Sequence, residues 1–103
     1  MRVLVFGGRD WKNRKATYAI LDQLDDEFHF TACIDGMAPG ADELAFDWAL
    51  SRGVKTERYK TDWEIYAENL PDLAVAFPGG DYTEYMTIRC EAAGMLVKKV
   101  SKK

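Results

Sequence analysis

Short apolar segments alternate with segments of helical periodicity along the whole chain, and this alternation constrains the fold more than any other feature. A run such as Val3–Phe6 is too short for a buried helix but has the length of a buried strand. Between the runs, apolar side chains recur every three or four positions, as one face of a helix requires. The expected strands are residues 2–6, 30–35, 54–59, 73–77 and 95–100, and the expected helices are residues 12–26, 42–52, 62–70 and 83–93.

Strands that alternate with helices predict an α/β fold: a Rossmann-like three-layer domain with a mostly parallel five-stranded sheet and helices on both faces. A length of 103 residues fits a single domain, residues 1–103. In such sheets, ligands bind beyond the carboxyl ends of the strands, where the strand order reverses. We therefore expect the functional residues in the loops that directly follow strands.

Composition and charge exclude several functional classes. The chain is 48% hydrophobic with a net charge of −3, and its basic residues are scattered apart from the C-terminal KKVSKK, which argues against a nucleic-acid partner. Cys33 and Cys90 lie far apart in apolar segments, which predicts buried free thiols; neither a metal site nor a cofactor is expected. The N-terminal apolar run is too short for a signal peptide or a membrane span, so we expect a cytoplasmic protein with no membrane partner.

The first loop, residues 7–11, reads GGRDW and follows the first expected strand. Gly7 and Gly8 allow close approach of a ligand to the backbone, and Arg9 can grip a phosphate through two parallel hydrogen bonds. Asp10 either caps the next helix or accepts a hydrogen bond from a ribose hydroxyl. Trp11 either stacks on a base or packs against the next helix.

Two further glycine-bearing loops follow strands: the second loop, residues 35–42, and the third loop, residues 78–83. The second loop is rich in small residues and, taken alone, is equally consistent with an ordinary helix start. In the third loop, the Thr83 hydroxyl could bind a phosphate oxygen or its own helix. Because each loop lies between a strand and a helix, all three should converge on one edge of the sheet. The candidate ligand-binding residues of these two loops are Gly36, Met37, Ala38, Pro39, Gly40, Ala41, Asp42, Pro78, Gly79, Gly80, Asp81, Tyr82 and Thr83.

The order of these motifs resembles the YspA-like branch of the SLOG superfamily, which is related to the LOG phosphoribohydrolases and to DprA. The segments that carry the resemblance are VLVFGGRDW, IDGMAPGADELAFDWALSRGV, TDW at 61–63, PDLAVAFPGGDYT and EAAG. The resemblance implies a nucleotide-binding domain whose ligand residues lie in the three loops. It also implies one of two roles, cleavage of a base from a nucleoside monophosphate or binding of nucleotide messengers such as cyclic ADP-ribose derivatives. Relatives often self-associate, so a homo-oligomer is expected.

Two departures from the family pattern favour binding over catalysis. Relatives usually carry, after the DW pair, a segment that supplies an arginine and an asparagine to the pocket, and this chain lacks it. Tyr82 occupies a glycine position of the PGGxGT pattern, and Glu84 stands without the paired glutamate of the LOG enzymes. Groups that would supply acid–base catalysis or stabilise a ribosyl cation are thus missing, while the binding loops remain.

The sequence therefore predicts a non-catalytic protein that sequesters or senses an ADP-ribose-type or cyclic nucleotide messenger, with viral anti-defence as one setting. The first alternative is a phosphoribohydrolase or N-glycosidase in which Glu84, Asp42 or Asp10 supplies acid or base. The second is an interaction module with a decayed nucleotide site, plugged by Tyr82. Five other aromatic residues are expected in the core or in a subunit interface: Tyr18, Phe46, Trp48, Trp63 and Tyr66.

Overall fold

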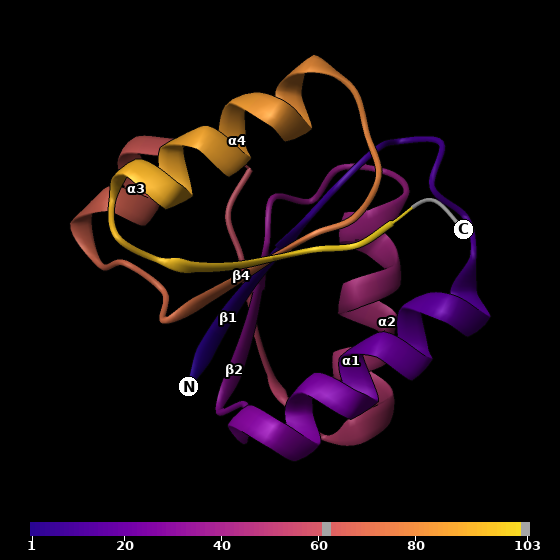
Figure 1. The fold of residues 1–103 in the computed structure, drawn as a ribbon. Helices are drawn as coiled ribbons and strands as arrows, with labels where there is room; N and C mark the ends of the chain where they lie inside the picture. The colour runs from indigo at the N-terminus through magenta and orange to yellow at the C-terminus, as the bar shows by residue number, and fades with distance from the viewer. Residues whose placement is uncertain (61–62, 102–103) are drawn as a thin grey trace.

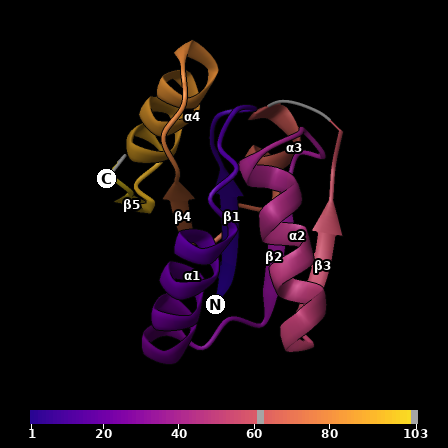
Figure 2. The same ribbon diagram turned by 90° about the vertical axis from the view of Figure 1, so that its right-hand side faces the viewer.

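The computed structural model describes residues 1–60 and 63–101, which form a five-stranded parallel sheet between two pairs of helices (Figure 1). The strand order is β3-β2-β1-β4-β5, and Figure 2 shows the strands side by side. The predicted Rossmann-like α/β fold is thus confirmed, with every strand parallel. The elements are β1 (Arg2–Phe6), α1 (Arg14–Phe28), β2 (Ala32–Asp35), α2 (Ala41–Arg52), β3 (Lys55–Arg58), α3 (Trp63–Glu68), β4 (Leu73–Ala76), α4 (Asp81–Ala92) and β5 (Leu96–Lys99).

Helices α1 and α2 cover one face of the sheet, and α3 and α4 cover the other (Figure 1). The alternation of side chains along β1 divides its apolar residues between these two layers. Val3 and Val5 pack with Trp48 of α2, whereas Leu4 packs with Met86 of α4. Because both faces are covered, the central strands read as continuous apolar runs rather than as alternating ones.

The edge strands and the cysteines also follow the sequence pattern. β3 and β5 lie at the two edges and are only partly buried, which suits their charged residues. Cys33 and Cys90 are buried free thiols, as predicted. Burial raises the pKa of each thiol to about 12, so both are unreactive at neutral pH.

Some predicted boundaries are wrong for identifiable reasons. α1 begins at Arg14 because the side-chain oxygen of Asn13 accepts a hydrogen bond from the Ala16 N–H at 3.0 Å. Asn13 is therefore the cap of this helix, so Asp10 does not have the capping role, which was one of the two roles predicted for it. α4 begins two residues earlier than predicted, with Gly80 at its N-cap. Of the predicted segments, residues 61–62 of the TDW motif and the final two lysines lie outside the described residues.

The carboxyl ends of β1, β2 and β4 lie at one edge of the sheet, together with the N-terminal ends of α2 and α4 (Figure 2). The strand order reverses between β1 and β4, which is where sheets of this kind bind ligands. Among the described helices, none combines the length and apolar character needed to cross a bilayer.

Candidate ligand-binding site

The three loops interlock through backbone contacts that require glycine. The Gly8 N–H donates to the Pro78 carbonyl at 2.9 Å, and the Gly8 carbonyl accepts from the Ala41 N–H at 3.3 Å. A Cβ added at Gly7 would lie 2.8 Å from the Cβ atoms of both Ala41 and Phe77, and one added at Gly8 would lie 2.8 Å from the Pro78 carbonyl oxygen. The backbones of the loops are therefore in direct contact, and these contacts fix the loops relative to one another.

A cavity of about 430 Å³ opens between the loops, which is within the size range of small-molecule sites. A smaller hollow of about 310 Å³ shares three of its residues. All residues that line either space are among those that the sequence singled out as ligand-binding candidates. The cavity is lined by Gly7, Gly8, Arg9, Gly36, Ala38, Asp42, Gly80, Asp81, Tyr82 and Thr83, and the hollow by Gly8, Arg9, Asp10, Trp11, Pro78, Gly79 and Gly80.

The remaining candidates shape the second loop. Met37 and Pro39 are exposed, and Met37 has a left-handed backbone with φ of 66°. Gly40 also has a left-handed backbone, with φ of 82°, and a Cβ there would collide with the Gly8 carbonyl oxygen. Ala41 is fully buried. These residues set the path of the loop and its contact with the first loop.

One end of the cavity is rich in hydrogen-bond donors. Within the described residues, the N–H groups of Arg9 and Gly80, which line the cavity, and of Gly79, which lines the smaller hollow, donate to no backbone carbonyl. Gly80 caps α4 without any side-chain hydrogen bond, so the first-turn N–H groups of the helix can donate to a ligand. The negative charges of Asp81 and Glu84 in this turn interact favourably with the helix dipole, although they would also repel a bound anion.

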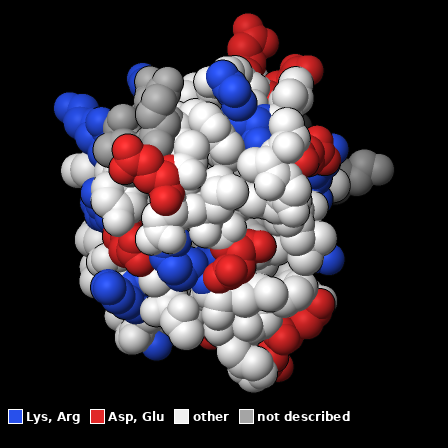
Figure 3. Space-filling model, turned by 90° about the vertical axis from the view of Figure 1, so that its left-hand side faces the viewer, with Lys and Arg blue, Asp and Glu red and all other residues white. Residues whose placement is uncertain are grey.

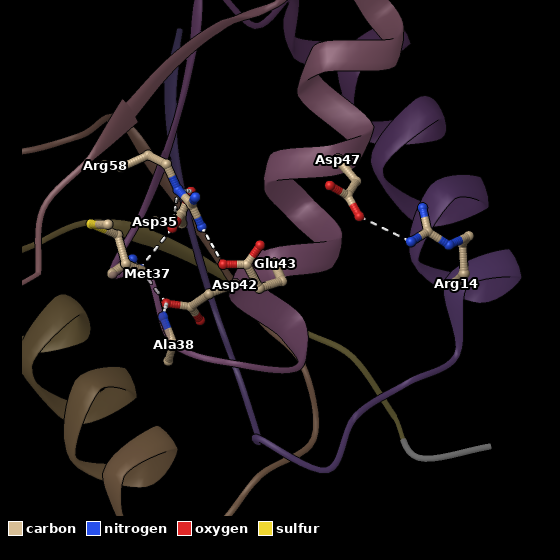
Figure 4. Close-up of polar contacts among 9 residues, drawn as sticks. Arg14, Asp35, Met37, Ala38, Asp42, Glu43, Asp47 and Arg58 are labelled. Atoms are coloured by element: carbon tan, nitrogen blue, oxygen red, sulfur yellow. Dashed lines mark hydrogen bonds and ion pairs between the residues drawn. The ribbon is translucent and has the colours of Figure 1, made fainter.

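The other end of the cavity holds a buried carboxyl group. Asp42 is 5% exposed, and its Oδ2 accepts hydrogen bonds from the N–H groups of Gly36 at 2.8 Å and Ala38 at 3.4 Å (Figure 4). Burial raises the pKa of Asp42 to about 6, against the opposing effect of these two hydrogen bonds; the nearby Asp35 raises the pKa further. Asp42 is thus a carboxyl group that titrates closer to neutral pH than an exposed aspartate.

A partly buried ion pair, between Arg58 and the fully buried Asp35, supports the second loop. Asp35, fully buried at the end of β2, accepts from the Met37 N–H at 2.7 Å and from the Arg58 Nε at 3.1 Å (Figure 4). Arg58 also contacts Glu43 of α2 at 2.7 Å. Burial raises the pKa of Asp35, and Arg58 opposes this effect. Sequence reasoning missed this pair, although a carboxylate that ends an apolar strand is a signal that a partner must exist.

Tyr66 is a second residue whose place in the site was missed. It is 3% exposed in the core beneath α3 and α4, where the sequence placed it. Its hydroxyl, however, lies 3.3 Å from the position that a Cβ on Gly36 would occupy, and Gly36 lines the cavity. No local pattern brings these two residues together, because the contact depends on the packing of α3 against β2.

The three acids proposed as alternative catalytic groups line three adjoining hollows. Asp42 lines the cavity, and Asp10 lines the smaller hollow beside it. Glu84 lines a third hollow with Lys99, on another side of the third loop. Trp11 is held beside the smaller hollow by a hydrogen bond from its Nε1 to the Thr17 hydroxyl at 2.8 Å. It therefore packs against α1, one of its two predicted roles.

Charges on the face shown in Figure 3 are dispersed: lysine and arginine side chains alternate with acidic and uncharged ones. Among the residues drawn in colour, this face carries no continuous basic surface of the kind that binds a nucleic-acid backbone. In residues 1–60 and 63–101, no three histidine, cysteine or acidic side chains gather closely enough to hold a metal ion.

A doubly wound parallel sheet with a loop-lined cavity where its strand order reverses defines a Rossmann-like α/β protein. More specifically, the chain belongs to the YspA, cpYpsA-related SLOG family, whose sequence profile matches residues 1–66. It is 30% identical over 97 residues to the gene 61 protein of Mycobacterium phage D29, in an alignment that covers 77% of this chain and 78% of that protein. No solved structure gives a significant match. The resemblance drawn from the motifs is thus confirmed.

Proposed function

We propose that this protein binds a nucleotide-derived ligand, such as an ADP-ribose derivative or a cyclic nucleotide messenger, and holds it without cleaving it. The observation that carries the proposal is the meeting of three interlocked loops around one cavity, with free backbone donors and Arg9 at one end. Membership of the SLOG family supports a nucleotide as the ligand class.

The phosphate of the ligand would bind at the donor-rich end. The N–H groups of Gly79 and Gly80 and the open first turn of α4 suit phosphate oxygens, because an N-terminal helix end carries partial positive charge. The Arg9 guanidinium adds charge-assisted hydrogen bonds, which are about twice as strong as neutral ones. Together they balance the negative charges of Asp81 and Glu84 in the same turn.

The distribution of the three candidate acids over three adjoining hollows supports holding rather than cleavage. Hydrolysis of an N-glycosidic bond requires an acid or base and a group that stabilises the developing cation at the same point. Asp10, Asp42 and Glu84 line three different spaces. Tyr82, 52% exposed on the first turn of α4, lines the cavity and offers a ring on which a base can stack.

We propose sequestration rather than sensing because a relative of this chain is a phage protein. The gene 61 protein comes from Mycobacterium phage D29. A phage protein that captures a nucleotide messenger of its host would need affinity and no turnover. That is the combination proposed here.

One observation favours a phosphoribohydrolase as the second candidate function. Asp42 lies in the cavity with a pKa of about 6, and a carboxyl group that titrates near neutral pH is suited to acid–base catalysis. In that case Asp42 would act alone as the proton donor or acceptor, and Arg9 would bind the phosphate of the substrate.

Calorimetric titration with ADP-ribose, cyclic ADP-ribose, cyclic AMP and AMP tests the proposal, and chromatography of the same mixtures detects released base. We expect micromolar or tighter binding of at least one compound and no released base. Base release that is abolished in Asp42→Asn would establish the hydrolase instead. If no compound of the panel binds at concentrations well above micromolar, the interaction module with a decayed nucleotide site is the function that remains. Light scattering in the same buffer tests the expected homo-oligomer.

A further inference from the structure

We propose that the outer face of α4 packs against α4 of a second copy of this chain, so that the two helices run parallel to each other about a twofold axis. This inference concerns a surface of the molecule and does not depend on the proposed nucleotide binding. Its starting point is that α4 carries apolar residues on two sides, although the sheet covers only one of them (Figure 1).

The side of α4 that faces the sheet belongs to the core. Thr83, Met86 and Cys90 are buried at spacings of three and four residues, as one face of a helix requires. Met86 and Cys90 pack in the same cluster as Leu4 of β1. A helix that has only this one partner would be expected to carry polar residues on its opposite side.

The opposite side of α4 repeats the apolar spacing instead. Tyr85, Ile88 and Ala92, which we call the outer stripe, are also three and four residues apart, and all three are exposed. Tyr85 is 42% exposed and Ile88 57%. A stripe with this spacing is the surface through which two helices pack along each other. Asp81 is in line with the stripe but lines the cavity, at the helix end where two crossing helices diverge.

Two opposite charges lie beside the outer stripe. The helical period places Glu84 on one side of it and Arg89 on the other. Neither side chain makes an ion pair within residues 1–60 and 63–101. The Arg89 Nε donates to the Tyr85 hydroxyl at 3.2 Å, and the guanidinium lies 5.3 Å from the ring centroid. Because Arg89 is already held against the stripe, it loses little freedom when its other N–H groups bind a carboxylate.

These charges select a second copy as the partner and a parallel arrangement of the two helices. In a parallel pair, the residue just before one apolar position faces the residue just after the next apolar position of the partner. Glu84 of each copy would thus face Arg89 of the other. In an antiparallel pair, Glu84 would face Glu91 of the other copy, which lies on the same side of the stripe and already pairs with Lys99 at 3.2 Å.

The arrangement has two consequences for the dimer. Each cavity lies at the N-terminal end of α4, so both cavities open at the same end of a parallel pair. The dimer is also weak, because one pair of 12-residue helices buries less surface than the ~800 Å² per partner of a standard interface.

Sedimentation velocity of the full chain, from about 5 µM to about 500 µM, tests whether the dimer forms and which face carries it. We expect a monomer at the low end and a growing fraction of dimer at the high end. Ile88→Lys should abolish the dimer. Leu50→Lys is the matched control, because Leu50 is 59% exposed on α2, on the other side of the sheet, and its replacement should leave the dimer intact. Thermal unfolding checks that each variant keeps its fold.

Charge exchange and cross-linking test the orientation. Glu84→Arg and Arg89→Glu should each weaken the dimer by about 10-fold or more, and the double variant should recover the wild-type affinity. Ile88→Cys should form a disulfide-linked dimer with diamide as the oxidant, because this position faces itself across a parallel twofold axis. The native cysteines are buried and should not react.

Three results would overturn the proposal. A wild-type protein that stays monomeric over the whole concentration range has no such interface. A dimer that survives Ile88→Lys forms through another face. A dimer that Ile88→Lys abolishes, but that shows neither recovery in the double charge variant nor cross-linking of Ile88→Cys, is not parallel.

Discussion

The backbone N–H of Gly8 donates a hydrogen bond to the carbonyl oxygen of Pro78 at 2.9 Å, which joins the loop after β1 to the loop after β4. These two strands are neighbours in the sheet, yet they are far apart in the sequence. Because the contact is between backbones, the walls of the cavity depend on glycines more than on large side chains. This dependence can be tested at two adjacent positions.

Gly79→Ala should destabilise the fold. A Cβ at this position would collide with the Thr83 hydroxyl and lie 2.6 Å from the Gly8 nitrogen, so the first and third loops would have to separate. We expect a loss of about 1–3 kcal/mol in the free energy of unfolding, as for overpacking. Urea denaturation measures it. A variant as stable as the wild type would show that the loops are not locked together.

Gly80→Ala should leave stability nearly unchanged but weaken nucleotide binding. Its φ of −99° suits any residue, and a Cβ there would meet no protein atom within 4 Å. The added methyl group would lie in open space at a residue that lines the cavity. We expect a change in stability of about 0.5 kcal/mol or less and at least a several-fold loss of affinity. Undiminished affinity would place the ligand away from the third loop.

Arg9→Gln should reduce affinity for phosphate-bearing ligands by about 10-fold to 100-fold, because a charge-assisted hydrogen bond contributes about 1.5–3 kcal/mol. Arg14→Gln is the matched control. Arg14 pairs with Asp47 on the exposed α1–α2 surface and lies outside the cavity (Figure 4). Titration with AMP in low and high salt compares the two variants. If both variants lose affinity equally, Arg9 acts only through the net charge of the protein and not through a specific contact with the phosphate.

Asp42 should make the wild-type protein less stable as the pH rises from about 4 to about 6. Its folded-state pKa of about 6 exceeds the ordinary value of 3.8, so the native state holds its proton more tightly than the unfolded chain does. The free energy of unfolding therefore falls across this window, by on the order of 2 kcal/mol, and levels off above it. In Asp42→Asn the contribution of Asp42 to this fall should be absent, while that of Asp35 remains. Asp35, whose pKa burial also raises, is present in both proteins, so urea denaturation of the pair at several pH values isolates Asp42.

Asp22→Ala should cost about 1–3 kcal/mol, because Asp22 accepts a hydrogen bond at 2.8 Å from the indole N–H of the fully buried Trp48. Asp22→Asn keeps an acceptor and should cost less. Asp22 also pairs with Arg52. Arg52→Gln removes this exposed pair and the contacts of Arg52 with Ser51 and the Tyr18 ring, and it should cost about 1 kcal/mol or less. Chemical denaturation with fluorescence detection measures all three. A larger loss in Arg52→Gln than in Asp22→Ala would contradict this order.

The elements and the candidate residues could be predicted because the signals for them are local. Periodicity of apolar residues marks strands and helices, and glycines after strands mark the loops of a parallel sheet. The cap of α1 shows where local reasoning failed, because Asp10 and Asn13 are both good caps by residue type. The hydrogen bond from Trp11 to Thr17 fixes the path of the chain between them, and this path makes Asn13 the cap.

The sequence by itself determined the alternating α/β pattern, the buried cysteines and the three loops that meet at one edge of the sheet. Only the tertiary structure decided which polar groups share a space. Arg58 reaches Asp35 across 23 positions, and the Tyr66 hydroxyl arrives under Gly36 through packing of α3. The candidate acids fall into separate spaces for the same reason. Such placements depend on how layers pack, and packing is a property of residues distant in the chain.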